Sequence, residues 1–423
     1  MNAIKMLITL VRLAARNMRR NRARTVLTMG MVMLGVGLLV IGTAWIQGIM
    51  GDTLVRATNM AGHVRVVTSQ FAAREALMPL DEHLTDTDAL VARLAAAPGV
   101  IEVAPRISTG VTVSAGDEIG DVFAMVVGAP LTWFERRLGA RDKLVAGGWF
   151  TGAKDELILG SKVAERAKAK VGDEVILLGV TRDGSMSPIK GRLVGVVGGV
   201  AGGVDSQILA PLEAIRWLTD IEDGAVELLV YGEGYRDAAA LAVSLRQVQA
   251  ASGAGQGALD IKAWSERDPW ASMLKATEGM QNIIVFIIVF LTALGIWNTM
   301  MMSVLERTHE IGVLRAMGLT RAGTVALFVL EALAIAVIGG LAGLVLGGVP
   351  SWLLETHGLH MGAEVAAKMS ATMPIGETVY ADLTASGLVN AFVLGLVIAF
   401  LGSVLPSMRA AGIQPVAAMR SGR

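Results

Sequence analysis

The chain has 423 residues, of which 53% are hydrophobic and only 17% are charged, and its mean hydropathy is +0.57. This composition is too apolar for an ordinary soluble protein of this length, so a membrane is the expected solvent. The absence of cysteine excludes a disulfide framework and a thiolate metal site.

Four apolar runs are long enough to cross a bilayer. They occupy residues 25–48, 281–304, 324–348 and 386–405. Each has the roughly 20 residues that a helix needs to cross about 30 Å of hydrocarbon. The first run follows a basic segment, as in a signal peptide, but it is longer than a signal-peptide apolar region and no small-residue cleavage site is evident. We therefore expect a retained membrane anchor.

Charge alternates between the segments that these runs separate. Residues 1–24, 305–323 and 406–423 together carry 13 basic and two acidic residues, whereas 49–280 and 349–385 carry 24 basic and 34 acidic residues. Lys and Arg in short flanking loops remain cytoplasmic. We therefore expect a multi-pass membrane protein, with both termini and the 305–323 loop in the cytoplasm and the two acidic segments on the outer side of the membrane.

The large segment 49–280 is long enough for one or two domains with their own cores. Short β-type runs bounded by turn-forming residues predict strands at 64–67, 111–113, 122–127, 157–159, 175–178, 193–197 and 259–263. Apolar residues at helical spacing predict helices at 88–97, 162–169 and 238–249. The mixture indicates an α+β domain.

Motifs for nucleotide chemistry are weak or absent. No GxxxxGK[ST] sequence occurs, so we expect no phosphate-binding loop of that kind. The glycine-rich segment 195–203 lacks the helix start and the downstream acidic residue of a dinucleotide-binding turn, and is interpreted as a turn. No nucleophile, base and orienting residue are recognisable together. We expect a chain without catalytic, cofactor or nucleic-acid sites.

A possible metal site lies after the third run. His357 and His360 occur near Met361, Met369 and Met373, a set that would suit a soft metal such as copper(I). Methionine is frequent throughout this chain, at 22 residues, and no cysteine or convergent carboxylate joins the pair. The sequence therefore favours histidines without a metal, although it leaves open whether they bind anything.

The 305–323 loop, LERTHEIGVLRAMGLTRAG, is short, charged and amphipathic. We predict a helix from about Glu306 to Met317, with Gly318 as its C-terminal stop. Apolar residues at helical spacing form one side, namely Ile311, Leu314 and Met317. Such a helix lies outside the membrane, either solvated or interfacial without a partner, or docked on one.

The third run contains one carboxylate and a repeat of small residues. Glu331 lies about two turns into the run, where a carboxylate is costly and is either functional or held by a neighbouring helix or water. Gly339, Gly343 and Gly347 recur every fourth residue, a spacing that allows helices to approach closely. We expect either the fourth span or a dimer partner against this glycine stripe.

Several strings resemble the FtsX/MacB-like permease family of type VII ABC transporters. ERTHEIGVLRAMG followed by FVLEALAIAVIGGLAG is similar to the family signature. RNMRRNRARTVLT at 16–28 resembles its amphipathic entry to the first span, ELILGSKVAERAKAKVGDEVILL at 156–178 its periplasmic core domain, and PSMRAAGIQPVAAMR at 406–420 its ending. The resemblance covers nearly the whole chain.

This resemblance implies a location, a fold and a role. The protein would be a multi-pass protein of a bacterial inner membrane, with its acidic segments in the periplasm. The fold would be four transmembrane helices with a large α+β, MacB-like periplasmic core domain between helices 1 and 2. The 305–323 loop would be the coupling helix that docks on a separate ATPase, which binds ATP and Mg, and transport would proceed by mechanotransmission. The residues expected to couple to the ATPase are Glu306, Arg307, Glu310, Ile311, Leu314, Arg315 and Gly318.

The layout favours one branch of the family. MacB carries a fused nucleotide-binding domain and FtsX has a much smaller outer domain, whereas the lipoprotein-releasing Lol permeases have a similar size. IKAWSERDPWASMLK at 261–275 also resembles the Lol-type entry to the second span. We therefore rank lipoprotein release first, with a LolD-like ATPase, a second permease copy or paralogue, membrane lipid and a lipoprotein cargo as partners. A MacB-like exporter of peptides or drugs, and a non-transport scaffold or sensor, remain alternatives.

Overall fold

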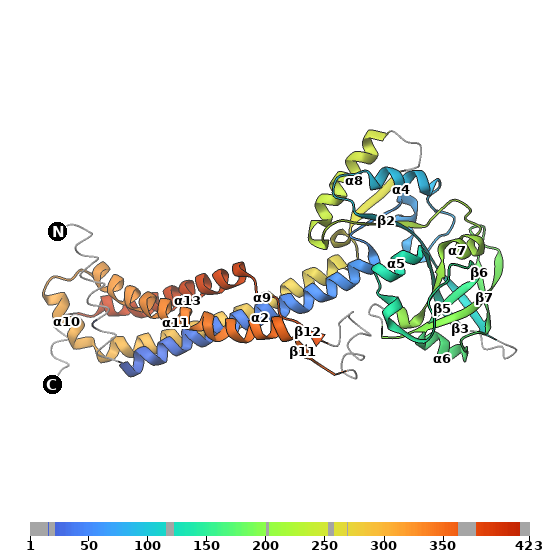
Figure 1. The fold of residues 1–423 in the computed structure, drawn as a ribbon. Coiled ribbons are helices and arrows are strands. Elements are labelled where there is room, and N and C mark those ends of the chain that lie inside the picture. Colours follow the sequence, from blue (N-terminus) through green and yellow to red (C-terminus); the bar gives the residue numbers. More distant parts are fainter. Residues whose placement is uncertain are drawn as a thin grey trace. The chain divides into compact units, whose positions relative to one another are not determined.

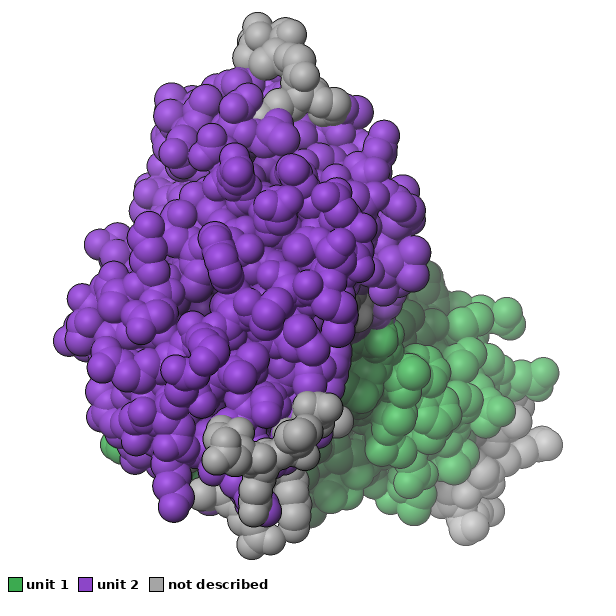
Figure 2. All heavy atoms as spheres, turned by 90° about the vertical axis from the view of Figure 1, so that its right-hand side faces the viewer, with its two compact units in different colours: residues 1–51, 276–360, 378–423 green, residues 52–275, 361–377 purple. Residues whose placement is uncertain are grey.

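A computed structural model describes most of the chain. The described residues are 16, 22–115, 122–199, 203–252, 258–268, 270–362 and 378–414. The chain divides into two compact units, coloured separately in Figure 2. The first, called the helical unit, comprises residues 1–51, 276–360 and 378–423; the second, called the α+β unit, comprises residues 52–275 and 361–377.

Four helices among the described residues are long and apolar enough to cross a membrane (Figure 1). They are α2 (Arg22–Ala61), α9 (Trp270–Glu306), α11 (Arg321–His357) and α13 (Ala385–Gly412). Each contains one of the apolar runs in the sequence. The helices extend beyond these runs because hydropathy detects only the apolar part of a helix: α2 continues 13 residues past residue 48, and α9 begins before residue 281.

Threonine caps begin two of these helices. The Thr320 hydroxyl accepts a hydrogen bond from the Gly323 N–H at the start of α11, and the Thr384 hydroxyl accepts one from the Gly387 N–H at the start of α13. Such caps satisfy amide groups that have no partner within the helix. Between α9 and α11 lies the short helix α10 (Thr308–Ala316), and after α11 the strands β11 (Leu359–His360) and β12 (Thr378–Val379) pair antiparallel.

The α+β unit is built on a mixed sheet. Its strand order is β10-β1-β9-β2-β3-β8-β5-β7-β4, and β6 pairs with β2 and β7. Two pairings, β3 with β8 and β5 with β7, are parallel, and the others are antiparallel. The strands are β1 (Val64–Thr68), β2 (Glu102–Ala115), β3 (Val122–Ala129), β4 (Leu144–Gly147), β5 (Glu156–Gly160), β6 (Glu174–Val180), β7 (Met186–Val197), β8 (Gln207–Pro211), β9 (Glu227–Tyr231) and β10 (Leu259–Ala263).

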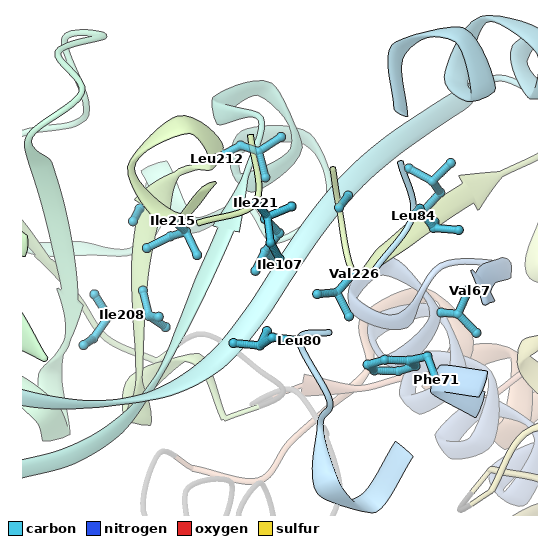
Figure 3. Packing of buried hydrophobic residues seen from close by; sticks show 14 of the residues in the cluster. Val67, Phe71, Leu80, Leu84, Ile107, Ile208, Leu212, Ile215, Ile221 and Val226 are labelled. Atoms are coloured by element: carbon cyan, nitrogen blue, oxygen red, sulfur yellow. The ribbon is translucent and has the colours of Figure 1, made fainter. Parts of the chain in front are cut away.

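Helices connect these strands and cover the sheet. They are α3 (Ser69–Ala73), α4 (Thr87–Ala95), α5 (Leu131–Arg136), α6 (Ser161–Ala167), α7 (Leu212–Thr219) and α8 (Ala238–Ser252). In α7, Leu212, Ile215 and Leu218 are buried, as apolar residues three apart on one helix face must be. Figure 3 shows Ile215 and Ile208 to one side of Ile107 in the core. The long strand β2 therefore runs through a core to which both β8 and α7 contribute.

Three strands of the sheet, β4, β8 and β9, were not predicted. β9 is buried at all five positions and β8 at four of five, so neither shows the alternation that marks a half-buried strand. β9 pairs with both β1 and β2, and it ends at Tyr231. The strand β9, which the sequence did not predict, therefore lies inside the sheet, between β1 and β2.

A buried histidine beside β9 makes the stability of the α+β unit dependent on pH. The pKa of His63 is lowered to about 4, chiefly by burial and then by the nearby charge of Arg137. Its Nδ1 accepts a hydrogen bond from the Gly232 N–H, a bond that requires the unprotonated nitrogen. The unfolded chain takes up a proton near the ordinary pKa of 6.5, so stability falls as the pH falls below that value.

We expect the free energy of unfolding to drop by about 2 kcal/mol between pH 6.5 and 4.5 because of His63 alone. The buried Glu227 acts at lower pH: burial would raise its pKa, but Arg106 and Arg65 outweigh burial and lower it. Unfolding of the full chain in detergent, followed by tryptophan fluorescence, measures this slope. His63→Gln should remove most of it, and an unchanged slope in that variant would exclude His63 as the source.

Candidate functional site

The short helix α10 is set between two long helices by local chain geometry. Helix α9 ends at Glu306, and Arg307 (φ −101°, ψ 17°) breaks the helical backbone before Thr308. Helix α10 ends at Ala316, and Gly318 has φ +102°, a conformation that glycine adopts without steric cost. The predicted helix and its glycine stop are therefore present in this loop, about one or two residues shorter than expected at each end.

A buried ion pair joins the start of α10 to α11. Arg307 Nη1 lies 3.2 Å from Glu331 Oε2 and 3.3 Å from Oε1, and each side chain is only 7% exposed. Each charge compensates the other where water is scarce, and removal of one partner leaves a costly buried charge. The sequence left open whether Glu331 is functional or is held by a neighbouring helix or by water. In the structure it contacts Arg307, at the start of the neighbouring helix α10.

Two further contacts tie the loop to the remaining long helices. Glu306, at the end of α9, forms an ion pair with Arg24 of α2. Arg315, in the last turn of α10, donates a hydrogen bond to the carbonyl of Ile413, which caps the C-terminus of α13. Together with the Arg307–Glu331 pair, these contacts link the α10 region to α2, α11 and α13.

The inner side of α10 faces the first turns of α11. The lining of a pocket here includes the apolar residues Ile311, Leu314, Leu327 and Phe328 and the charged residues Arg307 and Glu310. Ile311 is 4% exposed. Among the residues that the sequence assigned to ATPase coupling, Ile311 and Leu314 thus pack within the chain.

The sequence was wrong to place Met317 on the same side as Ile311. Met317 is 72% exposed, whereas Ile311 is buried. At about 100° per residue, positions six apart differ by roughly 120° around a helix, so Met317 lies at the far edge of the predicted stripe from Ile311. Met317 instead follows Val313 on the outer side.

The outer side of α10 was missed in the sequence. His309, Val313, Ala316 and Met317 are all exposed, and they follow the spacing of three and four residues that defines one helix face. Val313 is 36% exposed. A helical wheel would have found this outer face, defined here as His309, Val313, Ala316 and Met317, because it is the complement of the buried Ile311 side.

The glycine stripe of α11 packs against α2. A Cβ atom on Gly339, Gly343 or Gly347 would lie 2.5–2.8 Å from backbone oxygens of α2, those of Met29, Met33 and Gly37 respectively. The sequence had suggested the fourth span or a dimer partner here, but the neighbour is the first span. Helix α13 instead approaches the adjacent position Gly340, where an added Cβ would lie 2.9 Å from the ring of Phe392.

The histidines after the third run are bonded within the chain. His360 Nδ1 lies 2.8 Å from Thr378 Oγ1 across the β11–β12 pair, and His357 Nδ1 lies 2.8 Å from Thr356 Oγ1. Among the described residues, no cluster of three His, Cys, Asp or Glu side chains could hold a metal ion. Met369 and Met373, which the metal hypothesis included, lie outside the described residues.

Family models match both parts of the chain. The MacB-like periplasmic core domain matches residues 25–254, which is more than half of the chain, and the FtsX-like permease C-terminal model matches residues 282–415. The second match contains α10, the Arg307–Glu331 pair and the glycine stripe. The first contains most of the α+β unit.

Curated relatives include both export proteins and lipoprotein-releasing proteins. The macrolide export ATP-binding/permease protein MacB of Rhodospirillum rubrum is 27% identical over 429 residues, covering 97% of this chain and 60% of that protein. The lipoprotein-releasing system transmembrane protein LolC of Neisseria meningitidis is 24% identical over 419 residues, covering 94% of both. This chain therefore spans about 60% of the length of the MacB relatives it matches.

Among solved structures, the periplasmic region of MacB from Actinobacillus actinomycetemcomitans matches 51% of this chain and 92% of its own, with 13% identity and a TM-score of 0.35. The two family models together match four apolar helices and the α+β domain that lies between the first two of them in sequence. The chain belongs to the FtsX/MacB-like permease family.

Proposed function

We propose that this chain is the permease subunit of an ABC transporter, which couples ATP hydrolysis on a separate ATPase to movement of its α+β domain outside the cytoplasm. The observation that carries the proposal is α10: its outer face is exposed and, apart from His309, apolar, while contacts of the α10 region tie it to three long helices. A helix held in this way can receive a push from a partner and pass it on. ATP and Mg belong to the partner, which would be LolD-like, and this chain needs no cofactor of its own.

The charge pattern supports the orientation. The termini and the α10 loop are rich in Lys and Arg, which retains short segments in the cytoplasm. The outer face of α10 would then meet the ATPase, and the α+β domain would face the periplasm. The helical unit has few ionisable side chains within its apolar runs, which suits transmission of movement better than an aqueous channel.

The contacts of α10 define how a push would spread. Displacement of α10 acts on α2 through Glu306 and Arg24, on α11 through Arg307 and Glu331, and on α13 through Arg315. Helices α2 and α9 each contribute residues to both units, so the chain passes from the helical unit to the α+β unit within a helix. We infer that these two helices carry the movement outward, in a homodimer or with a paralogue.

Charge on the outer face of α10 should uncouple the ATPase. In Val313→Glu or Met317→Glu a carboxylate would be desolvated on docking, which should cost about 2 kcal/mol or more and weaken ATPase binding roughly thirtyfold. Copurification of a tagged chain with its ATPase, and ATPase activity in reconstituted vesicles, measure the effect. Val243→Glu, an exposed valine on helix α8, is a matched control and should behave as the parent chain.

Two results would contradict this role. Normal ATPase recovery and activity in both outer-face variants would remove α10 as the docking element. Consistent absence of any ATPase from preparations of the parent chain would favour the rival class, a membrane scaffold or sensor without a nucleotide-hydrolysing partner.

We rank lipoprotein release from the inner membrane above MacB-like export as the cargo function. The support is the matched length: this chain and LolC cover 94% of each other, whereas MacB is longer. Photo-crosslinking from the α+β domain in cells tests the cargo. Crosslinks to periplasmic lipoproteins that disappear when lipid modification is blocked would support release, and crosslinks to soluble peptides instead would support export.

A further inference from the structure

The C-terminal end of α2 lies in the α+β unit and is held by side chains far away in sequence. The last four carbonyl groups of a helix have no partner within it, and they form the negative end of the helix dipole. Tyr231 Oη donates a 2.7 Å hydrogen bond to the carbonyl of Asn59, and Arg106 Nη1 donates one to Met60. Arg267 Nη1 donates a 3.2 Å hydrogen bond to Ala61. Three successive carbonyls are therefore satisfied by three separate parts of the domain.

The chain geometry after α2 explains why side chains fill this role. Gly62 has φ +78°, and it turns the chain directly into β1, which begins at Val64. A Cβ at Gly62 would lie 3.0 Å from the Val64 carbonyl and 3.1 Å from Leu229 Cβ, so the turn is closely packed. The helix thus ends against the sheet, where donor side chains of the domain lie within reach of its last carbonyl groups.

Two of the donors are themselves fixed by the core. Tyr231 is fully buried, and its hydroxyl accepts a 2.7 Å hydrogen bond from Trp133 Nε1. The Arg137 guanidinium lies 3.9 Å from the centre of the Tyr231 ring. Arg106 Nε donates a 2.9 Å hydrogen bond to the buried carboxylate of Glu227. Both Tyr231 and Glu227 belong to β9. This strand therefore supplies one donor to the end of α2, Tyr231, and positions a second, Arg106, through Glu227.

The third donor connects α2 to α9. While its guanidinium binds the Ala61 carbonyl, the backbone carbonyl of Arg267 accepts a 2.8 Å hydrogen bond from the N–H of Ala271 in the first turn of α9. Burial and the nearby Arg65 lower the pKa of Arg267 to about 10, so it stays charged at neutral pH. One residue therefore touches the end of the first long helix and the beginning of the second.

We propose that Arg106, Tyr231 and Arg267 form a joint that fixes the C-terminus of α2 to the sheet and to the start of α9, so that the ends of these two helices that belong to the α+β unit move together with its sheet. The three are positioning residues: they act on helix ends and touch no cargo. The role in transport rests on the proposed function, whereas the joint itself does not depend on it.

Spin-label distances test the joint in the full chain. The chain has no cysteine, so Val55→Cys on α2 and Val243→Cys on α8, both exposed, give one labelled pair within the α+β unit. Arg267→Gln and Tyr231→Phe should each broaden the distance distribution. The population with a released helix end should rise about tenfold, as expected when a hydrogen bond involving a charged or buried group is lost.

Two controls separate the joint from general destabilisation. Arg74→Gln removes exposed ion pairs to Asp81 and Glu82 in the same unit and should leave the distribution narrow. Arg267→Lys keeps a cationic donor and should stay close to the parent. Tyr231→Phe removes only a hydroxyl, so it tests the joint even where an arginine variant fails to fold. Narrow distributions in both Arg267→Gln and Tyr231→Phe, or equal broadening in Arg74→Gln, would overturn the joint.

Reconstituted transport then tests what the joint does. With the ATPase present, Arg267→Gln should keep ATPase activity but lower the amount transported per ATP hydrolysed about tenfold, and Arg267→Lys should restore it. Equal transport in Arg267→Gln and the parent would overturn the transmission role. If the parent chain itself recruits no ATPase, the proposed function fails, while the spin-label result still decides whether the joint exists.

Discussion

Glu331→Leu should destabilise the helical unit by about 3–5 kcal/mol, because it breaks a buried ion pair from one side. The substitution removes the Glu331 carboxylate from the Arg307 guanidinium, which is 7% exposed, in the packed region where α10 meets α11. The measurement is the fraction of folded protein that survives heating in detergent, followed by size-exclusion chromatography of a fluorescently tagged chain.

A double variant separates the loss of the ion pair from the loss of the Glu331 side chain itself. Arg307→Leu combined with Glu331→Leu removes both charges, and apolar replacement of a buried ion pair is often neutral or stabilising, so most of the lost stability should return. Glu355→Leu, at an exposed position of the same helix, is the matched control and should change stability by less than about 0.5 kcal/mol. A double variant as unstable as Glu331→Leu would show that the carboxylate acts through some other contact.

Gly343→Leu and Gly347→Leu should each separate α11 from α2. A Cβ at Gly347 would lie 2.5 Å from the Gly37 carbonyl oxygen, and one at Gly343 would lie 2.7 Å from that of Met33. Backbone atoms cannot rotate away as a side chain can, so the helices must move apart, at about 1–3 kcal/mol for each site. The double variant should lose most of its folded population in the same heating assay.

The neighbouring glycine provides the control for this prediction. A Cβ at Gly348 would have only Leu388 Cδ2, at 4.0 Å, within contact distance, so Gly348→Leu has the same change in helix propensity and hydropathy without the clash. Stability equal to the parent in Gly348→Leu, with loss in Gly347→Leu, would locate the effect in the α2 contact. Equal loss in the two variants would mean that glycine is needed there for another reason.

The sequence predicted the features that depend on local pattern. Runs of about 20 apolar residues indicated the four long helices, and the β-type run and turn residues around Val64 indicated β1. β9 was missed because its five buried residues carry no alternation. The α+β character of the domain could therefore be predicted, while the strand that lies between β1 and β2 could not.

Contacts between distant segments could not be predicted from local pattern. Glu331 was recognised as costly, but its partner Arg307 lies 24 residues away on another element, and nothing in the spacing selects it from the other arginines. The glycine stripe of α11 was recognised as a close-packing face, yet its neighbour α2 is separated from it in sequence by most of the α+β unit and by α9 and α10. The outer face of α10 could have been predicted from the sequence by placing residues 308–317 strictly at 100° intervals around a helix.

The first and last strands of the α+β unit are hydrogen-bonded neighbours, with Val64 opposite Ala263 and Thr68 opposite Leu259. A domain closed in this way behaves as a cassette inserted between two helices. Its two ends in sequence, β1 and β10, lie side by side, so their spacing does not depend on the residues between them. Substitutions and insertions within the cassette leave the spacing of its two attachment points unchanged. Such a layout lets the surface outside the membrane diversify in evolution while the helices and the α10 loop are kept, and it predicts that cassettes can be exchanged between family members at the β1–β10 pair.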